Sequence, residues 1–293
     1  EARAEKLEAY VDNVKQEPLI ANLPKAGKIV SEKESSKFGY KELTLSNGAR
    51  VLLKKTNLKE GEVLMNASSK GGASLYGLND KINTEMFDAV IGYSGLGNFS
   101  STELQKALAG KNANVDLHLA NLHEYTSGSC TPKDMETMFQ MNYLYFTSIK
   151  KDEQAFNTLI NQYKMALKNK SLSPESALQD SLTYTLHAHN PRYTSLEEKD
   201  MDKVDYDRIL QIAKERTANA ADFTFTIVGN FDEALVRKYI EQYIASLPSV
   251  KKGKKYVHES WKPFSVYAKG ENDNTFYRKQ ETPKSNIYMF WYN

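Results

Sequence analysis

Residues 79–108 constrain the fold more than any other stretch of this chain, because they predict two helices separated by a glycine-containing turn. Between positions 80 and 93 apolar side chains recur every three or four residues, which is typical of a helix with one buried face. These apolar residues are Ile82, Met86, Ala89, Val90 and Tyr93. The glycines within residues 94–98 tolerate the backbone angles of a sharp turn. Ser100 or Ser101 then predicts the N-cap of a second helix, whose core-facing residues are Leu104, Ala107 and Leu108.

Alternating apolar residues predict several strands. The clearest strands form a hairpin, because Asn47-Gly48 is a strong two-residue turn signal between residues 42–45 and 51–53. Further strands are predicted at residues 62–68, 114–119, 125–131 and 222–230. Helical patterns occupy residues 132–146, 152–170, 174–186, 204–218 and 235–244. We therefore expect an α+β fold, with a mainly antiparallel sheet and helices packed on one face.

The composition excludes several classes of protein. A length of 293 residues allows a large core and more than one domain. A net charge of +2 gives no positive field that would gather nucleic acid. The single cysteine, Cys130, excludes an internal disulfide and a cysteine-based zinc site, and we expect it to be a small buried side chain. No run of about 18 apolar residues is present, so no transmembrane segment is expected.

Two short stretches resemble a known family of peptidases. After the first predicted helix come Gly97, Asn98, Phe99, Glu103, Leu104, Leu108 and Gly110, in that order. Residues 226–232 read Thr-Ile-Val-Gly-Asn-Phe-Asp, a hydrophobic run into Val-Gly-Asn before the last predicted helix. Both stretches resemble the pitrilysin/insulinase family of zinc peptidases, whose catalytic half carries an inverted HxxEH motif. The resemblance extends over roughly the whole chain and is most specific at residues 97–110 and 226–232.

The zinc ligands of that family are missing here. Two histidines on adjacent helical turns can hold zinc on one helix face, while the glutamate between them polarises a bound water. The first histidine of this chain is residue 118, and the motif positions are occupied by Met86, Ala89 and Val90. In the resemblance the helix at residues 152–170 would supply a third ligand, a glutamate, but its middle carries amides and lysines. The resemblance therefore indicates a non-catalytic half, and we expect no catalytic residue and no metal ligand in this chain.

The resemblance also implies a fold and a role. The fold would be that of the mitochondrial processing peptidases and the LuxS-like metallohydrolases. The two halves of the family's peptidases close on a chamber, where one half supplies zinc and the other holds the peptide. An open sheet edge in the chamber wall can bind an extended peptide as an added strand. This chain is thus expected to form part of the chamber wall, with zinc bound by a catalytic half in the same polypeptide or in a partner subunit.

The resemblance leaves two points open. The alternative role is a purely structural, assembly or peptide-binding subunit without protease activity. The compartment is not visible in the sequence, because the first residues lack the apolar core of a signal peptide. Bacterial relatives of this kind are often periplasmic or cell-envelope proteins, so that location is an expectation from the resemblance alone.

We predict three parts along the chain. Residues 1–37 would be a connector from a preceding domain, and residues 38–250 a complete non-catalytic peptidase-like domain. Residues 251–293 would be a linker and the truncated start of a second, similar domain. Within that last part, residues 285–293 predict a strand that is apolar on both sides and has no visible partner.

Few residues qualify as binding residues. Arg192 and Tyr193 follow Pro191 in a predicted loop and are the candidates for contact with a peptide. A nucleophilic hydrolase is not indicated, because no Gly-x-Ser-x-Gly elbow is present.

The histidines form two possible but incomplete metal sites. His118 and His123-Glu124 are five positions apart, so on one strand they would face opposite ways and only a tight turn could bring them together. His187 and His189 lie near a helix end, where their directions would diverge by about 200°. We expect neither set to bind a metal, although each remains an alternative.

Overall fold

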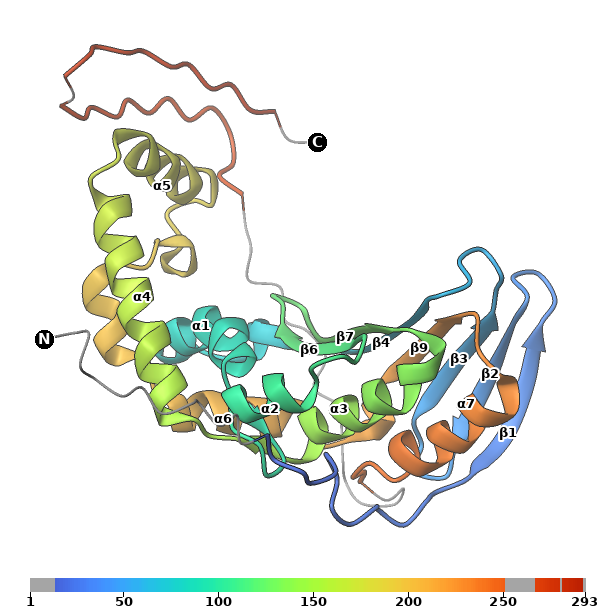
Figure 1. Cartoon of the computed structure of the whole chain (residues 1–293). Coiled ribbons are helices and arrows are strands. Elements are labelled where there is room, and N and C mark those ends of the chain that lie inside the picture. The colour runs from blue at the N-terminus through green and yellow to red at the C-terminus, as the bar shows by residue number, and fades with distance from the viewer. Residues whose placement is uncertain (1–13, 251–266, 280, 292–293) are drawn as a thin grey trace, which may run out of the picture.

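A seven-stranded sheet forms the centre of the computed structural model, which describes residues 14–250, 267–279 and 281–291 (Figure 1). Its strand order is β1-β2-β3-β9-β4-β7-β6. The strands are β1 Ile29–Ser35, β2 Tyr40–Leu45, β3 Arg50–Lys55, β4 Val63–Lys70, β6 Ala113–Leu119, β7 His123–Cys130 and β9 Thr224–Gly229. Every neighbouring pair is antiparallel except β3 and β9, which run parallel. The predicted mainly antiparallel sheet is confirmed.

The β2–β3 hairpin closes at the predicted Asn-Gly turn. Gly48 has a φ of 89°, a left-handed conformation that glycine adopts without steric cost. The Asn47 side chain accepts a hydrogen bond from the Ala49 amide at 3.2 Å. Its amide group also donates to the Ile244 carbonyl at 2.8 Å. The turn is therefore fixed both locally and by the end of the last helix.

The two faces of the sheet differ in polarity. On one face the alternate side chains are buried, as Val51 and Leu53 are on β3 and Phe225 and Ile227 on β9. On the other face the alternate residues are more exposed, and Asn66 is one example. This alternation is what a sheet with one covered face requires.

Helices cover the buried face and leave the other face open (Figure 1). They are α1 Lys81–Gly92, α2 Ser101–Ala107, α3 Met135–Thr147, α6 Tyr206–Thr217 and α7 Glu233–Tyr239, which continues as a π-helix over Ile240–Ile244. Met138 and Phe139 of α3, Ile209 of α6 and Val236 of α7 are fully buried in the shared core. The predicted α+β fold with helices on one face is confirmed.

The helix–turn–helix predicted at residues 79–108 is present. Gly97 in the turn has a φ of 58° and donates its amide to the Ser148 carbonyl at 2.8 Å. The turn also contains β5 (Gly95–Leu96), which pairs with β8 (Ile149–Lys150). Ser100 is the N-cap of α2 and forms a capping box with Glu103. The predicted cap is therefore confirmed at Ser100.

Two further helices form an arm beside the sheet. Helix α4 (Glu153–Ser171) rises past the level of the sheet, and α5 (Pro174–Leu186) lies at its far end (Figure 1). Only Leu159 and Ile160 of α4 are buried, and no residue of α5 is. The arm is thus mostly exposed, and it rises beside the end of the sheet that carries β6 (Figure 1).

Two sequence predictions at the ends of the domain need correction. Residues 29–35, which we assigned to the connector, form edge strand β1 and pair with β2. The pattern did not reveal this strand, because most of its side chains are exposed. The strand predicted at residues 285–293 is wrong for residues 285–291, which are extended but pair with no strand in the described residues. The remainder of that strand, and residues 251–266 of the predicted linker and domain start, lie outside the described residues.

Candidate functional site

The face of α1 that would carry a zinc motif is packed into the core. Met86 and Val90 are each only 1% exposed, and Ala89 is partly buried against the core. A methyl and an isopropyl group offer no lone pair, and a buried thioether is not among the nitrogen, thiolate and carboxylate ligands that zinc prefers. These residues do not fit a zinc ion. Among the described residues no group of three or more His, Cys, Asp or Glu side chains could hold a metal.

Strand β6 next to α1 is a free edge of the sheet. The residues that flank β6 show which of its backbone groups face β7. Asn112 accepts from the Thr131 amide, and Ala120 donates to the His123 carbonyl. By the register of the pair, the backbone groups of the even-numbered residues between them also face β7. In an antiparallel pair the odd-numbered residues must then point their backbone groups outward. The Leu119 amide does so, and it donates to Asp88 at 2.8 Å.

The outward backbone groups of Val115 and Leu117 remain available. No hydrogen bond joins them to any other described residue. Their side chains are buried in the core, so the main chain alone faces outward at this edge. An edge of this kind can accept an additional strand.

A small hollow lies in the corner where the end of β6 meets α1 and the segment that follows α5. Its volume is about 220 Å³. We call it the corner hollow, and it is lined by Ala73, Lys81, Thr84, Glu85, Asp88, Leu119, Asn121, Arg192 and Tyr193. Both candidate peptide-binding residues of the sequence analysis therefore lie on one hollow, next to the last residue of the free edge.

The charged residues of α1 in the corner hollow are held by short contacts. Lys81 pairs with Glu85 at 2.7 Å and donates to the Thr194 carbonyl at 2.7 Å. Burial raises the pKa of Glu85, and Lys81 opposes that rise. Asp88 is half exposed and holds both the Leu119 amide and His118. The sequence analysis did not single out these three residues, although their spacing places them on one side of α1.

Arg192 and Tyr193 are placed by a short 3₁₀ helix, η4 (Pro191–Tyr193). The Asn190 side chain caps it by accepting from the Arg192 amide at 3.0 Å. The Arg192 guanidinium donates to the carbonyl oxygen of Tyr76. The Tyr193 ring stacks on His187 with ring centres 3.6 Å apart and an angle of 5° between the planes. The two candidate residues are therefore fixed in place.

The first histidine pair converges on a tyrosine. A tight turn between β6 and β7 places both rings against Tyr125, His118 at 4.7 Å and His123 at 5.1 Å between ring centres. Glu124 points to the core instead and accepts from the Gly72 amide at 2.7 Å. The three side chains that the sequence places together are thus divided between the two faces of the sheet.

The second histidine pair separates at the end of α5. His187 stacks on Tyr193, whereas His189 makes an edge contact with Tyr184 at 5.0 Å. Ala188 and His189 have positive φ values of 54° and 56°, which turn the chain out of the helix.

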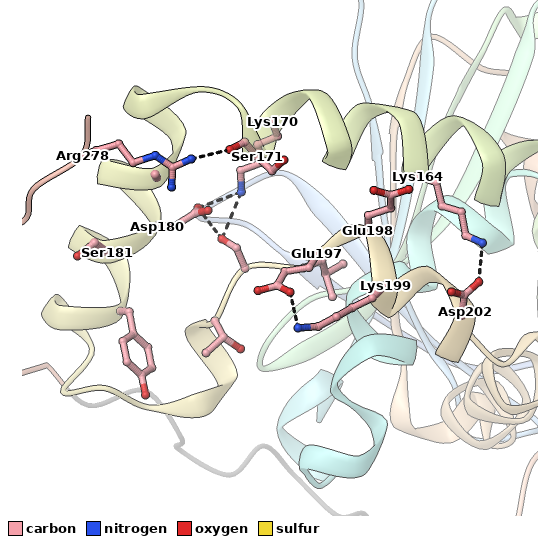
Figure 2. Close-up of a pocket in the computed structure, with 15 residues that line it drawn as sticks. Lys164, Lys170, Ser171, Asp180, Ser181, Glu197, Glu198, Lys199, Asp202 and Arg278 are labelled. Carbon is pink, nitrogen blue, oxygen red and sulfur yellow. Dashed lines mark hydrogen bonds and ion pairs between the residues drawn. The ribbon is translucent and has the colours of Figure 1, made fainter. Parts of the chain in front are cut away.

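A larger hollow of about 810 Å³ lies along the arm, between α4, α5 and the 3₁₀ helix η5 (Glu198–Lys203) (Figure 2). Most of its charges form ion pairs with each other. Lys170 pairs with Asp180 at 2.9 Å, and Lys199 pairs with Glu197 at 2.6 Å. The dashed lines in Figure 2 show that both partners of each pair belong to the lining of the hollow.

Comparisons with known proteins identify the relatives of this chain. No family model matches it. A zinc protease PQQL-like protein of Arabidopsis thaliana is 23% identical over 238 residues, which is 81% of this chain and 22% of the relative. The probable zinc protease PqqL of Escherichia coli (strain K12) is 26% identical over 218 residues, which is 74% of this chain and 23% of the relative. The chain spans about a quarter of the length of these relatives.

Solved structures show the same fold. The periplasmic protease PqqL from Escherichia coli matches 89% of this chain with 28% of its own, at a TM-score of 0.72 and 23% identity. The ferredoxin protease FusC, solved as a mutant in complex with Arabidopsis ferredoxin, gives a TM-score of 0.64 at 16% identity, with 88% of this chain and 28% of its own covered. A peptidase M16 inactive domain from Pseudomonas fluorescens gives a TM-score of 0.56 at 14% identity. The match covers 73% of this chain and 53% of that domain's chain.

The resemblance predicted from the residues is therefore confirmed. The curated relatives are zinc proteases, and the structural neighbours include an inactive peptidase domain with the fold of this chain. Within the described residues no helix has the length and apolar character needed to cross a membrane.

Proposed function

We propose that this chain is the non-catalytic half, or part of it, of a zinc metallopeptidase, and that it forms a wall of the chamber in which peptides are bound. One observation carries the proposal: α1 presents Met86 and Val90 to the core where a catalytic half would present ligands, while β6 beside it stays open. The chain resembles zinc proteases but is suited to binding rather than to bond cleavage.

The open edge supplies the main contacts in this proposal. An extended peptide would lie along β6 and exchange hydrogen bonds with the outward groups of Val115 and Leu117. Contacts of this kind involve only main-chain atoms, so they would accept peptides of many sequences. The pairing would stop at Leu119, because Asp88 already occupies its amide.

Arg192 and Tyr193 would act at the end of this edge. They line the corner hollow together with Leu119, so a peptide that leaves β6 would meet them next. A guanidinium group can donate to a peptide carbonyl or carboxylate, and a tyrosine ring can pack on an apolar side chain. We assign both residues to peptide binding.

Zinc would be held by a catalytic half outside these residues, in the same polypeptide or in a partner subunit. The chain covers only 22% and 23% of its curated relatives, which leaves room for such a half in proteins of that length. Residues 251–293 would lead into the next domain, and residues preceding β1 would connect to the previous one. A location in the periplasm or cell envelope would follow that of the periplasmic neighbour PqqL. Peptides or proteins would be the substrates, as ferredoxin is for FusC.

Peptide binding tests the proposal directly. A fluorescein-labelled casein peptide should bind the purified chain, with binding followed by fluorescence anisotropy, and the chain alone should leave the peptide intact. Replacement of Arg192 or Tyr193 by alanine should weaken binding by about 5- to 30-fold, which corresponds to the loss of one or two good contacts. Arg50→Ala, an exposed arginine on β3, serves as the control and should bind normally.

Two results would oppose the proposal. Cleavage of the peptide by the chain alone would show that it has its own catalytic centre. An absence of peptide binding would favour the structural or assembly role instead.

A further inference from the structure

A segment after the domain lies on the arm. We call residues 267–279 and 281–284 the strap. The Ala268 amide donates to the Leu186 carbonyl at 2.9 Å, and the Asn274 amide group donates to the Thr185 hydroxyl at 2.9 Å. Further along, Arg278 donates to the Ser171 carbonyl at 3.0 Å. The strap therefore follows α5 back towards the end of α4, as Figure 1 shows.

The first residue of the strap completes an aromatic stack. The Tyr267 ring lies 4.9 Å from the His187 ring at an angle of 27°. His187 in turn stacks on Tyr193 at 3.6 Å. The three rings connect the strap, the end of α5 and the corner hollow in one continuous row.

The backbone between His187 and Tyr193 needs such support. Ala188 and His189 both have left-handed φ values, which cost a non-glycine residue roughly 1 kcal/mol or more. A conformation of this kind persists only where surrounding contacts determine it. The stack on His187 and the edge contact of His189 with Tyr184 are such contacts.

We propose that Tyr267 and His187 are positioning residues, which hold Arg192 and Tyr193 in the orientation that lines the corner hollow. This inference rests on the proposed function, since the residues it positions are the proposed peptide contacts. Under the proposed function, the strap belongs to the segment that leads into the next domain. The geometry of the peptide site would therefore depend on how that domain is docked. Release of the strap would loosen the 187–193 loop and weaken peptide binding.

The strap provides a matched control for the test. Tyr277 lies in the same segment but is 88% exposed and makes no ring contact with the described residues. Tyr267→Ala should weaken binding of the casein peptide by about 3- to 10-fold, the range expected for loss of one aromatic stack. Tyr267→Phe keeps the ring and should bind the peptide as the wild type does. Tyr277→Ala should also bind it as the wild type does. All three variants should keep the wild-type circular dichroism, because both tyrosines lie outside the core.

Amide hydrogen exchange separates this inference from the proposed function. The amides of Arg192 and Tyr193 are hydrogen-bonded to Asn190, so their exchange reports directly on the order of the loop. In the absence of peptide, Tyr267→Ala should accelerate their exchange, and Tyr277→Ala should not. Unchanged exchange in Tyr267→Ala, or equal effects of both alanine variants, would overturn the inference. If the exchange effect is present but the wild-type chain binds no peptide, the proposed function is contradicted and the positioning role stands.

Discussion

Strands β1 and β6 are the two edges of the same sheet, but they differ in charge, exposure and the availability of their backbone groups. Strand β1 is almost wholly exposed and carries Glu32, Lys33 and Glu34 in succession. It is also tied to the helix layer, since the Ile29 amide donates to Glu241 and Glu32 pairs with Arg237 at 3.0 Å. Charged residues of this kind prevent a sheet edge from pairing with another chain.

Strand β6 has the opposite character. Its buried residues alternate regularly, its outward main chain is unoccupied at Val115 and Leu117 among the described residues, and it ends at the corner hollow. The difference indicates that one edge is protected and the other is kept available. Exposure of a sheet edge is a hazard unless it serves binding, so function is best sought at β6.

The largest effect should come from the core beneath the open edge. Met86→Ala removes a side chain that is fully buried in α1, the helix that packs against β6. We expect the free energy of unfolding to fall by about 2–5 kcal/mol, because a cavity remains. Urea denaturation followed by circular dichroism measures the change. The comparison variant Val30→Ala, on β1 where the side chain is 60% exposed, should change stability by less than about 0.5 kcal/mol.

An ion pair near each edge should give the next largest difference. Arg208 binds Asp80 at the start of α1 through two hydrogen bonds of 2.9 and 2.7 Å, and these bonds hold the pKa of Asp80 below its usual value. Arg208→Ala should lower the free energy of unfolding by roughly 2 kcal/mol at neutral pH. Lys41→Ala removes the half-exposed pair with Glu233 near β1 and should cost less than about 1 kcal/mol.

The pH dependence gives this second prediction a definite sign. A carboxylate with a lowered pKa stabilises the fold above its unfolded pKa, which is about 3.9 for aspartate. That stabilisation is lost as the pH falls through the folded pKa of Asp80. The difference between wild type and Arg208→Ala should therefore shrink in urea titrations below about pH 4. A difference that stays constant with pH would assign the effect of Arg208 to packing instead.

After the Met86 and Arg208 substitutions, the helix caps should give the next largest loss of stability. Ser100 caps α2, and Asp232 caps α7, which braces β1, by accepting from the Leu235 amide at 2.8 Å. Alanine at either position should cost about 1 kcal/mol, measured as a decrease in thermal midpoint. Only Ser100→Ala also breaks a capping box, so it should show the larger decrease of the two. Equal losses would mean that the Glu103 contact contributes nothing measurable.

The local parts of the fold were predictable because their signals are local. Asn47-Gly48 predicted a hairpin, and the pair Ser100-Ser101 predicted a helix cap, each within a few residues of sequence. The apolar alternation of Phe223, Phe225 and Ile227 identified a strand for the same reason. Strand β1 could not be predicted from such a pattern, because its stability comes from pairing and from surface ion pairs rather than from an apolar face.

The site could be predicted only in part. The sequence indicates Arg192 and Tyr193 as candidates. In the corner hollow they lie beside Lys81, Glu85 and Asp88, which are about a hundred positions away in the sequence. No periodic pattern encodes that approach, and none encodes the parallel contact of β3 with β9. The openness of β6 depends on strand order, which a single sequence does not show.

Hydrogen exchange at the two edges shows which of them binds a peptide. The chain is incubated with excess casein peptide, and amide exchange is compared with that of the free chain at β1 and β6. We predict slower exchange at Val115 and Leu117, whose amides would bond to the added peptide, and unchanged exchange across residues 29–35. Protection at β1 instead, or no protection at either edge under conditions where the peptide binds, would show that β6 is not the peptide-binding edge.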